Sequence, residues 1–368
     1  MRHRGTSRRV PGPSREGFAL LMVLILVGVA AVVGAAYVSA ANVRRTSVQN
    51  LVALEQARYA GESGLQHALH LMQRNTPAVL NTSAGPFTLS TGGGTYVVSA
   101  TCLDASKNLY RLNSTATVGG ITRTCRANLY WWSTYYTTAM GMTPKGYWRL
   151  GDSTATAKDE KGWKTGTYRN NRYLGQTSAL AADNNTAAWF DGSTSYVDLS
   201  KADPGGGRFA VAAWVKASGW SCTTPRIVSK ANGPSVLYWE LRAAKKTSTT
   251  GTMVFALATG VGRTLKTITA NVDFAVGDWV FVVGTYNKDT GTMKFYQNGV
   301  LAGSTTHSGD ISRDSTVETW IGACGNYGLP WYGTIDEVMI FEKELTDTEV
   351  KTLHAKRWAD VQYATWSN

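Results

Sequence analysis

The chain has 368 residues, of which 43% are hydrophobic and 17% are charged, so its composition is that of a folded protein and excludes a disordered chain. Lys and Arg number 37 against 25 Asp and Glu, for a net charge of +12. This excess is spread along the chain without a long basic run, so we do not expect a nucleic acid partner. The length suits a membrane helix with one or two domains.

An uncharged apolar stretch occupies residues 18–43 and is long enough to cross a bilayer as a helix. Helical periodicity continues beyond it, so the sequence predicts one helix over residues 18–76 with a transmembrane part at 18–43. Five arginines precede the stretch, which by the positive-inside rule predicts a cytoplasmic amino terminus. We therefore expect a single-pass protein of the inner or cytoplasmic membrane with its bulk outside the cytoplasm.

Two motifs in this region resemble those of type IV pilins. Residues 1–17 resemble a prepilin leader, cut between Gly17 and Phe18, and residues 56–69 read QARYAGESGLQHAL. This second motif resembles the end of the same helix in PilX-like minor pilins and type II secretion pseudopilins. Met22 stands where most pilins carry a glutamate, which favours a minor component over a major subunit. The resemblance implies other pilin or pseudopilin subunits as partners, with Glu62 as a candidate assembly residue.

Other interpretations of the amino-terminal region stay open. The small residues before Ala41 would also suit cleavage of a secretory signal peptide after Ala40, and an uncleaved signal anchor is a third possibility. Glu62 also fits an ordinary solvated helix residue. The pilin interpretation accounts for both the Gly-Phe junction and the later motif, whereas the others account for neither.

A small antiparallel β domain is predicted at residues 86–136. Three alternating segments, separated by turn residues, indicate a meander that buries one face on the preceding helix. Residues 137–146 are predicted to be a linker. The four cysteines fall into two pairs, and pairing is expected outside the cytoplasm, so we predict two disulfides. The first joins Cys102 to Cys125 and the second joins Cys222 to Cys324.

Residues 147–357 are rich in short β segments divided by turn residues, which predicts an all-β sandwich. Motifs such as WFDGSTSYVD at 189–198 and GTIDEV at 333–338 resemble successive motifs of laminin-G-like, concanavalin A-like jelly rolls. Thr346 and Glu349 form a capping box that predicts a short closing helix. Residues 358–368 are predicted to be a C-terminal tail.

The laminin-G-like resemblance implies a possible calcium site at Asp191 and Asp336, since calcium prefers oxygen ligands. Both residues also suit simple roles in turns and caps. For a ligand, the candidate residues are Trp163, Trp220 and Tyr327, because aromatic rings in Gly- and Ser-rich segments suit stacking on sugars. Tryptophans within strand patterns, such as Trp189 and Trp279, are explained by core packing.

We do not expect an enzyme. Retaining glycosidases need two carboxylates on one face, whereas Asp336 and Glu337 are neighbours and would point to opposite faces of a strand. The sequence therefore predicts a minor pilin-like surface protein that displays a jelly roll for adhesion to glycan or protein ligands. A structural or priming pseudopilin without a carbohydrate ligand is one alternative. A membrane-anchored or secreted lectin outside any filament is the other.

Overall fold

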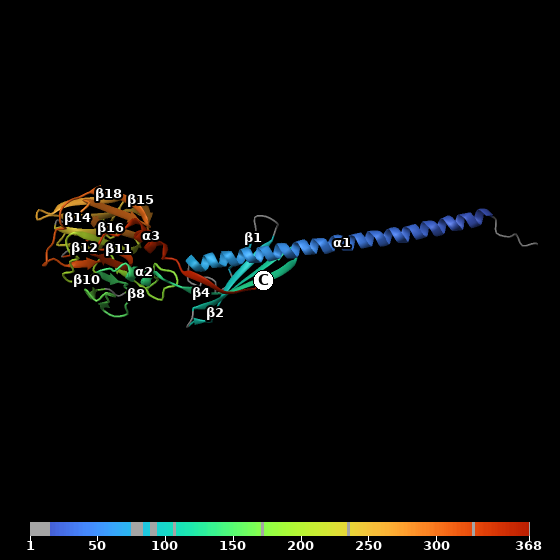
Figure 1. Cartoon of the computed structure of the whole chain (residues 1–368), viewed down its shortest axis with the longest axis horizontal. Helices are drawn as coiled ribbons and strands as arrows, with labels where there is room; N and C mark the ends of the chain where they lie inside the picture. Colours follow the sequence, from blue (N-terminus) through green and yellow to red (C-terminus); the bar gives the residue numbers. More distant parts are fainter. Residues whose placement is uncertain are drawn as a thin grey trace, which may run out of the picture.

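A computed structural model describes residues 15–74, 84–88, 94–105, 108–170, 173–233, 236–325 and 328–367. One long helix, a small sheet packed on its carboxyl half and a large β sandwich follow one another in space (Figure 1). The predicted order of a long apolar helix and an all-β sandwich is confirmed. Residues 1–14 of the predicted leader lie outside the described residues.

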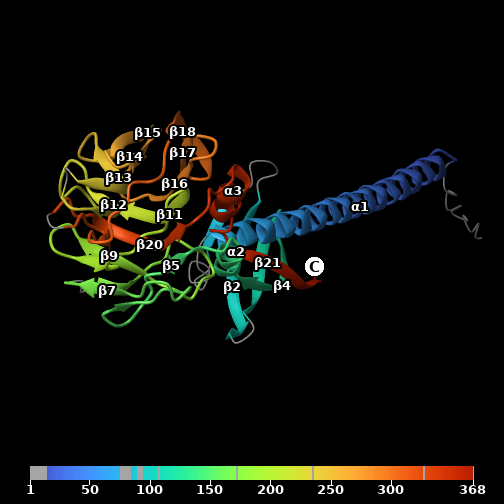
Figure 2. The same cartoon turned by 60° about the vertical axis from the view of Figure 1, so that its left-hand side comes forward.

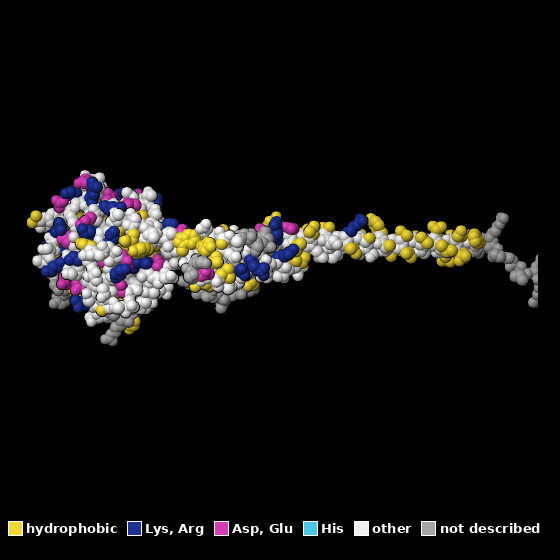
Figure 3. Space-filling model, turned by 60° about the horizontal axis from the view of Figure 1, so that its bottom comes forward, with side chains coloured by type: hydrophobic (Ala, Val, Ile, Leu, Met, Phe, Trp, Pro, Cys, Tyr) yellow, Lys and Arg dark blue, Asp and Glu magenta, His cyan; other side chains and the backbone are white. Residues whose placement is uncertain are grey.

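Helix α1 (Arg15–Arg74) is continuous through the uncharged stretch and the later motif. Its segment Phe18–Gln73 is long and apolar enough to cross a membrane, and its most apolar window makes no buried contact within the chain. Figure 3 shows hydrophobic side chains along the free length of this helix. The amino-terminal half of α1 therefore has no partner among the described residues.

A five-stranded antiparallel sheet, which we call sheet 1, packs on the carboxyl half of α1. Its strand order is β1-β2-β3-β4-β21. The bounds are Ala84–Thr88 for β1, Thr95–Asp104 for β2, Leu109–Val118 for β3, Ile121–Trp132 for β4 and Asp360–Ser367 for β21. The meander predicted from the alternating segments corresponds to β2, β3 and β4 and is confirmed.

Small residues let sheet 1 approach α1 closely. A Cβ atom on Gly61 would lie 2.7 Å from the Cys125 Sγ, and one on Gly64 would lie 2.1 Å from the Ser114 Oγ. Ala57, Ala60 and Ala68 lie on the same buried face of the helix. The Ala-Gly-Glu-Ser-Gly-Leu motif thus has a packing reason, because larger side chains at either glycine would push the sheet away.

The carboxyl-terminal residues form strand β21, which pairs antiparallel with β4, so the prediction of a tail at 358–368 is wrong (Figure 2). The sandwich is therefore inserted in the connection between β4 and β21 of sheet 1. The predicted linker is also wrong in part, because α2 (Tyr135–Gly141) occupies its first half and buries Tyr135 and Ala139 completely. Apolar side chains at these two positions explain the docking of α2 on the sandwich.

The sandwich consists of two eight-stranded sheets. Sheet 2 has the order β15-β14-β13-β12-β19-β10-β7-β6. Its bounds are Thr156–Ala157 for β6, Gly166–Arg169 for β7, Tyr196–Asp198 for β10, Arg226–Ala231 for β12, Leu237–Lys245 for β13, Thr250–Thr259 for β14, Thr264–Ala275 for β15 and Thr319–Ile321 for β19.

Sheet 3 has the order β18-β17-β16-β11-β20-β9-β8, and β5 pairs with β20. Its bounds are Gly146–Trp148 for β5, Tyr173–Gln176 for β8, Ala187–Asp191 for β9, Arg208–Ala217 for β11, Trp279–Asn287 for β16, Thr292–Gln297 for β17, Val300–Thr306 for β18 and Tyr332–Phe341 for β20.

Sheet 3 is buried on both faces at its centre. On β11, Val211 and Val215 enter the core between the sheets, while Ala212 and Trp214 face outward. This outer side is covered by α2 and by α3 (Asp347–Ala355), whose predicted capping box at Thr346 is present. Strand β11 therefore has no polar face, which its sequence of nearly continuous apolar residues reflects.

All four cysteines are free thiols, so the predicted disulfides are not formed. Cys125 pairs across the sheet with Ser114, which pairs with Val98, whereas Cys102 lies four residues further along β2. Two strand spacings and four residues of rise separate the two cysteine Cα atoms by about 16 Å, beyond the reach of a disulfide. Cys324 is buried in the sandwich, and Cys222 lies half-buried in the loop after β11.

Candidate functional site

The two acids on β20 lie at an irregularity of the strand. The register between β11 and β20 shifts between Ala212 and Trp214, and Glu337 has a φ of 51°. A β-bulge of this kind re-aims side chains. As a result Asp336 and Glu337 both lie on the outer side of sheet 3, and the expectation that they point to opposite faces is wrong.

Both acids are completely buried and bound by protein groups. The Glu337 carboxylate accepts hydrogen bonds from the Tyr147 hydroxyl and from the Arg149 guanidinium, whose Nε lies 2.9 Å away. Asp336 accepts from the Ser178 Oγ at 2.7 Å and from a backbone N–H. Burial raises the pKa of Asp336 to about 7 and that of Glu337 to about 8. With no exposed atom, the pair cannot reach a substrate and instead joins β20 to neighbouring segments.

The residues predicted to bind calcium do not fit one ion. Asp191 pairs across the sheet with Tyr332, four residues before Asp336, which places the Cα atoms of the two acids about 13 Å apart along the strand direction. Burial would raise the pKa of Asp191, but hydrogen bonds from the Ser195, Ser193 and Thr194 backbone N–H groups outweigh it and lower the pKa to about 2. These donors already satisfy the Asp191 carboxylate, and they present positive dipole ends where a cation would have to approach.

The predicted ligand-binding aromatics are not brought together. Trp163 packs on Trp148 near the β6 end of sheet 2, with ring centroids 6.3 Å apart. Trp220 packs on Gly251 and Phe274 near the opposite end, at β14 and β15. Both rings are partly buried against the core, so each has a packing role. Tyr327 lies outside the described residues.

The candidate site is a groove of about 720 Å³ at one end of the sandwich. The turn between β15 and β16, the end of β17 and the segment after α3 meet there. Its lining includes Phe274, Asp278, Trp279, Gln297, Asn298 and Arg357. Trp279 is the first residue of β16 and is partly exposed, because the core takes the alternate residues Val280 and Val282.

One groove residue has a buried side-chain oxygen without a hydrogen-bond donor. Gln297 is 6% exposed, and its Oε1 contacts no donor within the described residues. A buried amide oxygen without a donor costs about 1–3 kcal/mol, so Gln297 is a destabilising feature of the groove wall. Beside it, Asp278 is exposed and offers acceptors. The groove thus combines an aromatic ring for stacking with polar groups that fix the orientation of a polyhydroxylated ligand.

The Arg357 side chain is positioned from several sides. Its Nε donates to the Ala179 carbonyl at 2.9 Å, and its guanidinium lies over the rings of Trp214 at 4.9 Å and Trp358 at 4.7 Å. Cation–π contacts of this kind hold the guanidinium in place. Arg357 therefore supplies a fixed cation at the groove.

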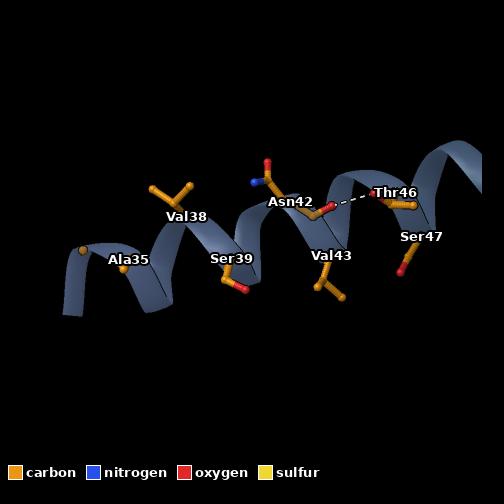
Figure 4. Close-up of a pocket in the computed structure, with 8 residues that line it drawn as sticks. Ala35, Val38, Ser39, Asn42, Val43, Thr46 and Ser47 are labelled. Atoms are coloured by element: carbon orange, nitrogen blue, oxygen red, sulfur yellow. Dashed lines mark hydrogen bonds between the residues drawn. The ribbon is translucent and has the colours of Figure 1, made fainter. Parts of the chain in front are cut away.

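A second hollow lies along α1 and is no ligand cavity. Figure 4 shows its lining residues, which include Ala35, Val38, Asn42 and Thr46, on a single exposed helix. The Thr46 hydroxyl donates to the Asn42 carbonyl of the same helix at 2.9 Å. No other described residue faces these side chains, so the hollow is only the uneven surface of a single exposed helix.

Comparisons with known proteins agree with this fold. Residues 191–351 match the Laminin_G_3 family, described as the concanavalin A-like lectin/glucanases superfamily. The carboxyl-terminal sandwich is thus a concanavalin A-like jelly roll, as predicted. No curated protein matches the sequence.

Solved structures with a similar fold include domain 4 of AbnA, a GH43 extracellular arabinanase from Geobacillus stearothermophilus, in complex with arabinotriose. It is 20% identical, with 57% of this chain and 98% of that chain covered and a TM-score of 0.42. A heptameric SAP-like pentraxin from Limulus polyphemus is 19% identical over 41% and 71% of the chains, with a TM-score of 0.34. The botulinum neurotoxin serotype G binding domain is 16% identical over 58% and 50%, with a TM-score of 0.43.

Sequence reasoning missed the groove because it assigned Trp279, like Trp189, to the core. Both rings are partly exposed on the outer side of sheet 3. Alternation was the available signal: in Trp279-Val-Phe-Val the valines occupy the inner face, so the tryptophan must face outward. Gln297 and Arg357 carried no such signal, since only the folded chain brings them beside Trp279.

Proposed function

We propose that this protein is a minor pilin-like surface protein whose jelly roll binds glycans at the groove beside Trp279. The observation that carries the proposal is the position of the sandwich, inserted between β4 and β21 at the end of a helix whose other half is apolar and free. Such an arrangement presents a binding domain away from the membrane. The concanavalin A-like fold and the polar, aromatic lining of the groove support a carbohydrate ligand.

The pilin-like role rests on α1. Beyond the uncharged stretch, Val48 and Leu51 are each about 60% exposed, and Val52 is half exposed. A lone anchor needs no apolar side chains past the membrane, whereas helices that pack with others do. This exposure favours pilin or pseudopilin partners over a lectin outside any filament. It is equally compatible with a structural or priming pseudopilin that has no carbohydrate ligand.

Two measurements test the proposal. The mass of the amino-terminal peptide of protein from its native cells should correspond to a chain that begins at Phe18. A chain that begins at Ala41 would contradict the pilin-like role. Separately, a glycan array probed with the full-length protein in detergent should give signals that Trp279→Ala abolishes. An array without signal would leave the structural or priming pseudopilin as the better description.

A further inference from the structure

A line of side chains crosses the outer side of sheet 3 and ends at the groove. The strand registers place Tyr173 opposite Trp189, Trp189 opposite Thr334, Thr334 opposite Lys216, and Lys216 opposite Trp279. Residues directly opposite each other point to the same face. These five residues, which we call the aromatic row, therefore share the outer surface of five adjacent strands from β8 to β16.

Contacts between the side chains hold the row in place. The Tyr173 and Trp189 rings lie 4.8 Å apart at 86°, and the Trp189 and Tyr332 rings lie 5.5 Å apart at 72°. The Trp189 Nε1 donates to the Ser218 Oγ at 3.0 Å, which fixes the rotation of the indole. At the other end, the Lys216 Nζ lies 5.5 Å from the centre of the Trp279 ring. The rings are thus ordered before a ligand arrives.

Four residues of the row remain accessible, whereas Thr334 between them is buried, with 5% of its surface exposed. Tyr173 is 52% exposed, and Trp189, Lys216 and Trp279 are all partly exposed. Further along β11, Ala212 and Trp214 lie under α2 and α3. Large aromatic rings thus remain partly exposed on this outer surface, beside the part that the two helices cover.

From these observations we infer that the aromatic row extends the groove into a platform for a linear polysaccharide of several sugar units, an inference that rests on the proposed glycan-binding function. Four strand spacings make the row about 19 Å long, which suits a chain and exceeds what one terminal sugar contacts. Sugar rings stack on aromatic faces, while the accessible Ser218 hydroxyl and Lys216 amine bind sugar hydroxyls.

A glycan fits this surface better than a protein partner does. Protein interfaces centre on a buried, continuous apolar core. Here Ser218 and Lys216 lie between Trp189 and Trp279, so accessible hydrogen-bonding groups separate the two partly exposed indole rings. Continuity with the groove through Trp279, which lines it, gives both surfaces the same ligand.

The experiment uses the full-length protein in detergent micelles. Affinity electrophoresis through gels that contain hydroxyethylcellulose, glycol chitin, xylan, pectin or dextran identifies a polysaccharide that retards it. Calorimetry then measures binding of oligosaccharides of that polysaccharide with two to six units. We expect the affinity to rise with chain length. Trp189→Ala should lower the affinity for six units by about tenfold and leave that for two units unchanged.

Matched variants separate stacking from folding. Trp279→Ala should weaken binding at every length, Trp189→Phe should restore most of the loss, and Trp320→Ala on sheet 2 should have no effect. Equal affinities for two and six units, or wild-type binding by Trp189→Ala, would overturn the platform while leaving glycan binding at the groove intact. If no polysaccharide retards the protein and the glycan array also gives no signal, both the platform and glycan binding at the groove are overturned.

Discussion

The packing of sheet 1 on α1 makes Gly64 a sensitive position. A methyl group there would lie 2.1 Å from the Ser114 Oγ and 2.8 Å from the Tyr96 ring. Alanine favours the helix by up to about 1 kcal/mol, whereas overpacking costs about 1–3 kcal/mol. Since atoms crowd the site on two sides, we expect Gly64→Ala to weaken the docking of sheet 1 by about 1–2 kcal/mol net.

The free thiols supply the assay for this change. Cys125 is 1% exposed under α1, and Cys324 is buried in the sandwich, so both react with a thiol reagent only when their surroundings open. A loss of about 1–2 kcal/mol should raise the labelling rate of Cys125 about 5- to 30-fold in the full-length protein. The labelling rate of Cys324 should stay unchanged, because the sandwich has its own core.

Two control variants accompany Gly64→Ala, one at another glycine of α1 and one at Ser114, the residue that Gly64 contacts. Gly34→Ala meets no atom within 4 Å and should leave Cys125 labelling at the wild-type rate. Ser114→Gly removes the nearest contact, so the double variant should recover part of the loss. Wild-type labelling of Cys125 in Gly64→Ala would refute the argument that the small residues of the motif exist to admit the sheet.

Three further outcomes are expected. Because burial raises the pKa of Asp336 to about 7 and that of Glu337 to about 8, the folded state holds protons that the unfolded state releases near pH 4. The free energy of unfolding should therefore fall as the pH rises from about 4 to 8, by about 1.4 kcal/mol per pH unit for each proton, and Asp336→Asn should flatten this slope in denaturant titrations. Deletion of residues 360–368 removes β21 and should expose Cys125 to labelling while the melting temperature of the sandwich stays unchanged; wild-type labelling would contradict the role of β21. Calcium or EDTA should leave that melting temperature unchanged, since Asp191 is already satisfied; a clear increase with calcium would contradict the argument.

The helices and strands that could be predicted from local sequence patterns were those that contact residues nearby in the sequence. The periodicity of residues 18–72 and the hairpins of β2 to β4 depend on neighbours a few residues away. Strand β21 pairs with β4 across more than two hundred intervening residues, so nothing near Asp360 indicates its partner. Its alternating Val361, Tyr363 and Thr365 were the only local sign of a strand.

The site was less predictable because it depends on where strands end. Trp279 and Trp214 both lie in apolar β segments, yet only Trp214 lies beneath the two helices. The bulge at Glu337 likewise follows from the packing of β20 against β11 and reverses the expected direction of a side chain. The exposure of Trp279 and the direction of the Glu337 side chain both depend on tertiary contacts. The alternation of residues along a strand carries no information about such contacts.

The insertion of the sandwich in sheet 1 explains how a binding domain can keep a fixed orientation on a single helix. Two connections join the sandwich to adjacent strands, and the Ala359 N–H donates to the Gln73 carbonyl at the end of α1. The Ala181 N–H donates in turn to the Arg357 carbonyl, and the Arg357 side chain lines the groove. A sandwich on a single terminal linker would rotate freely, whereas here the segment 357–359 binds α1 through Ala359 and supplies the Arg357 side chain to the groove. Under the proposed function, a force on ligand bound at the groove would therefore be transmitted to α1 and sheet 1.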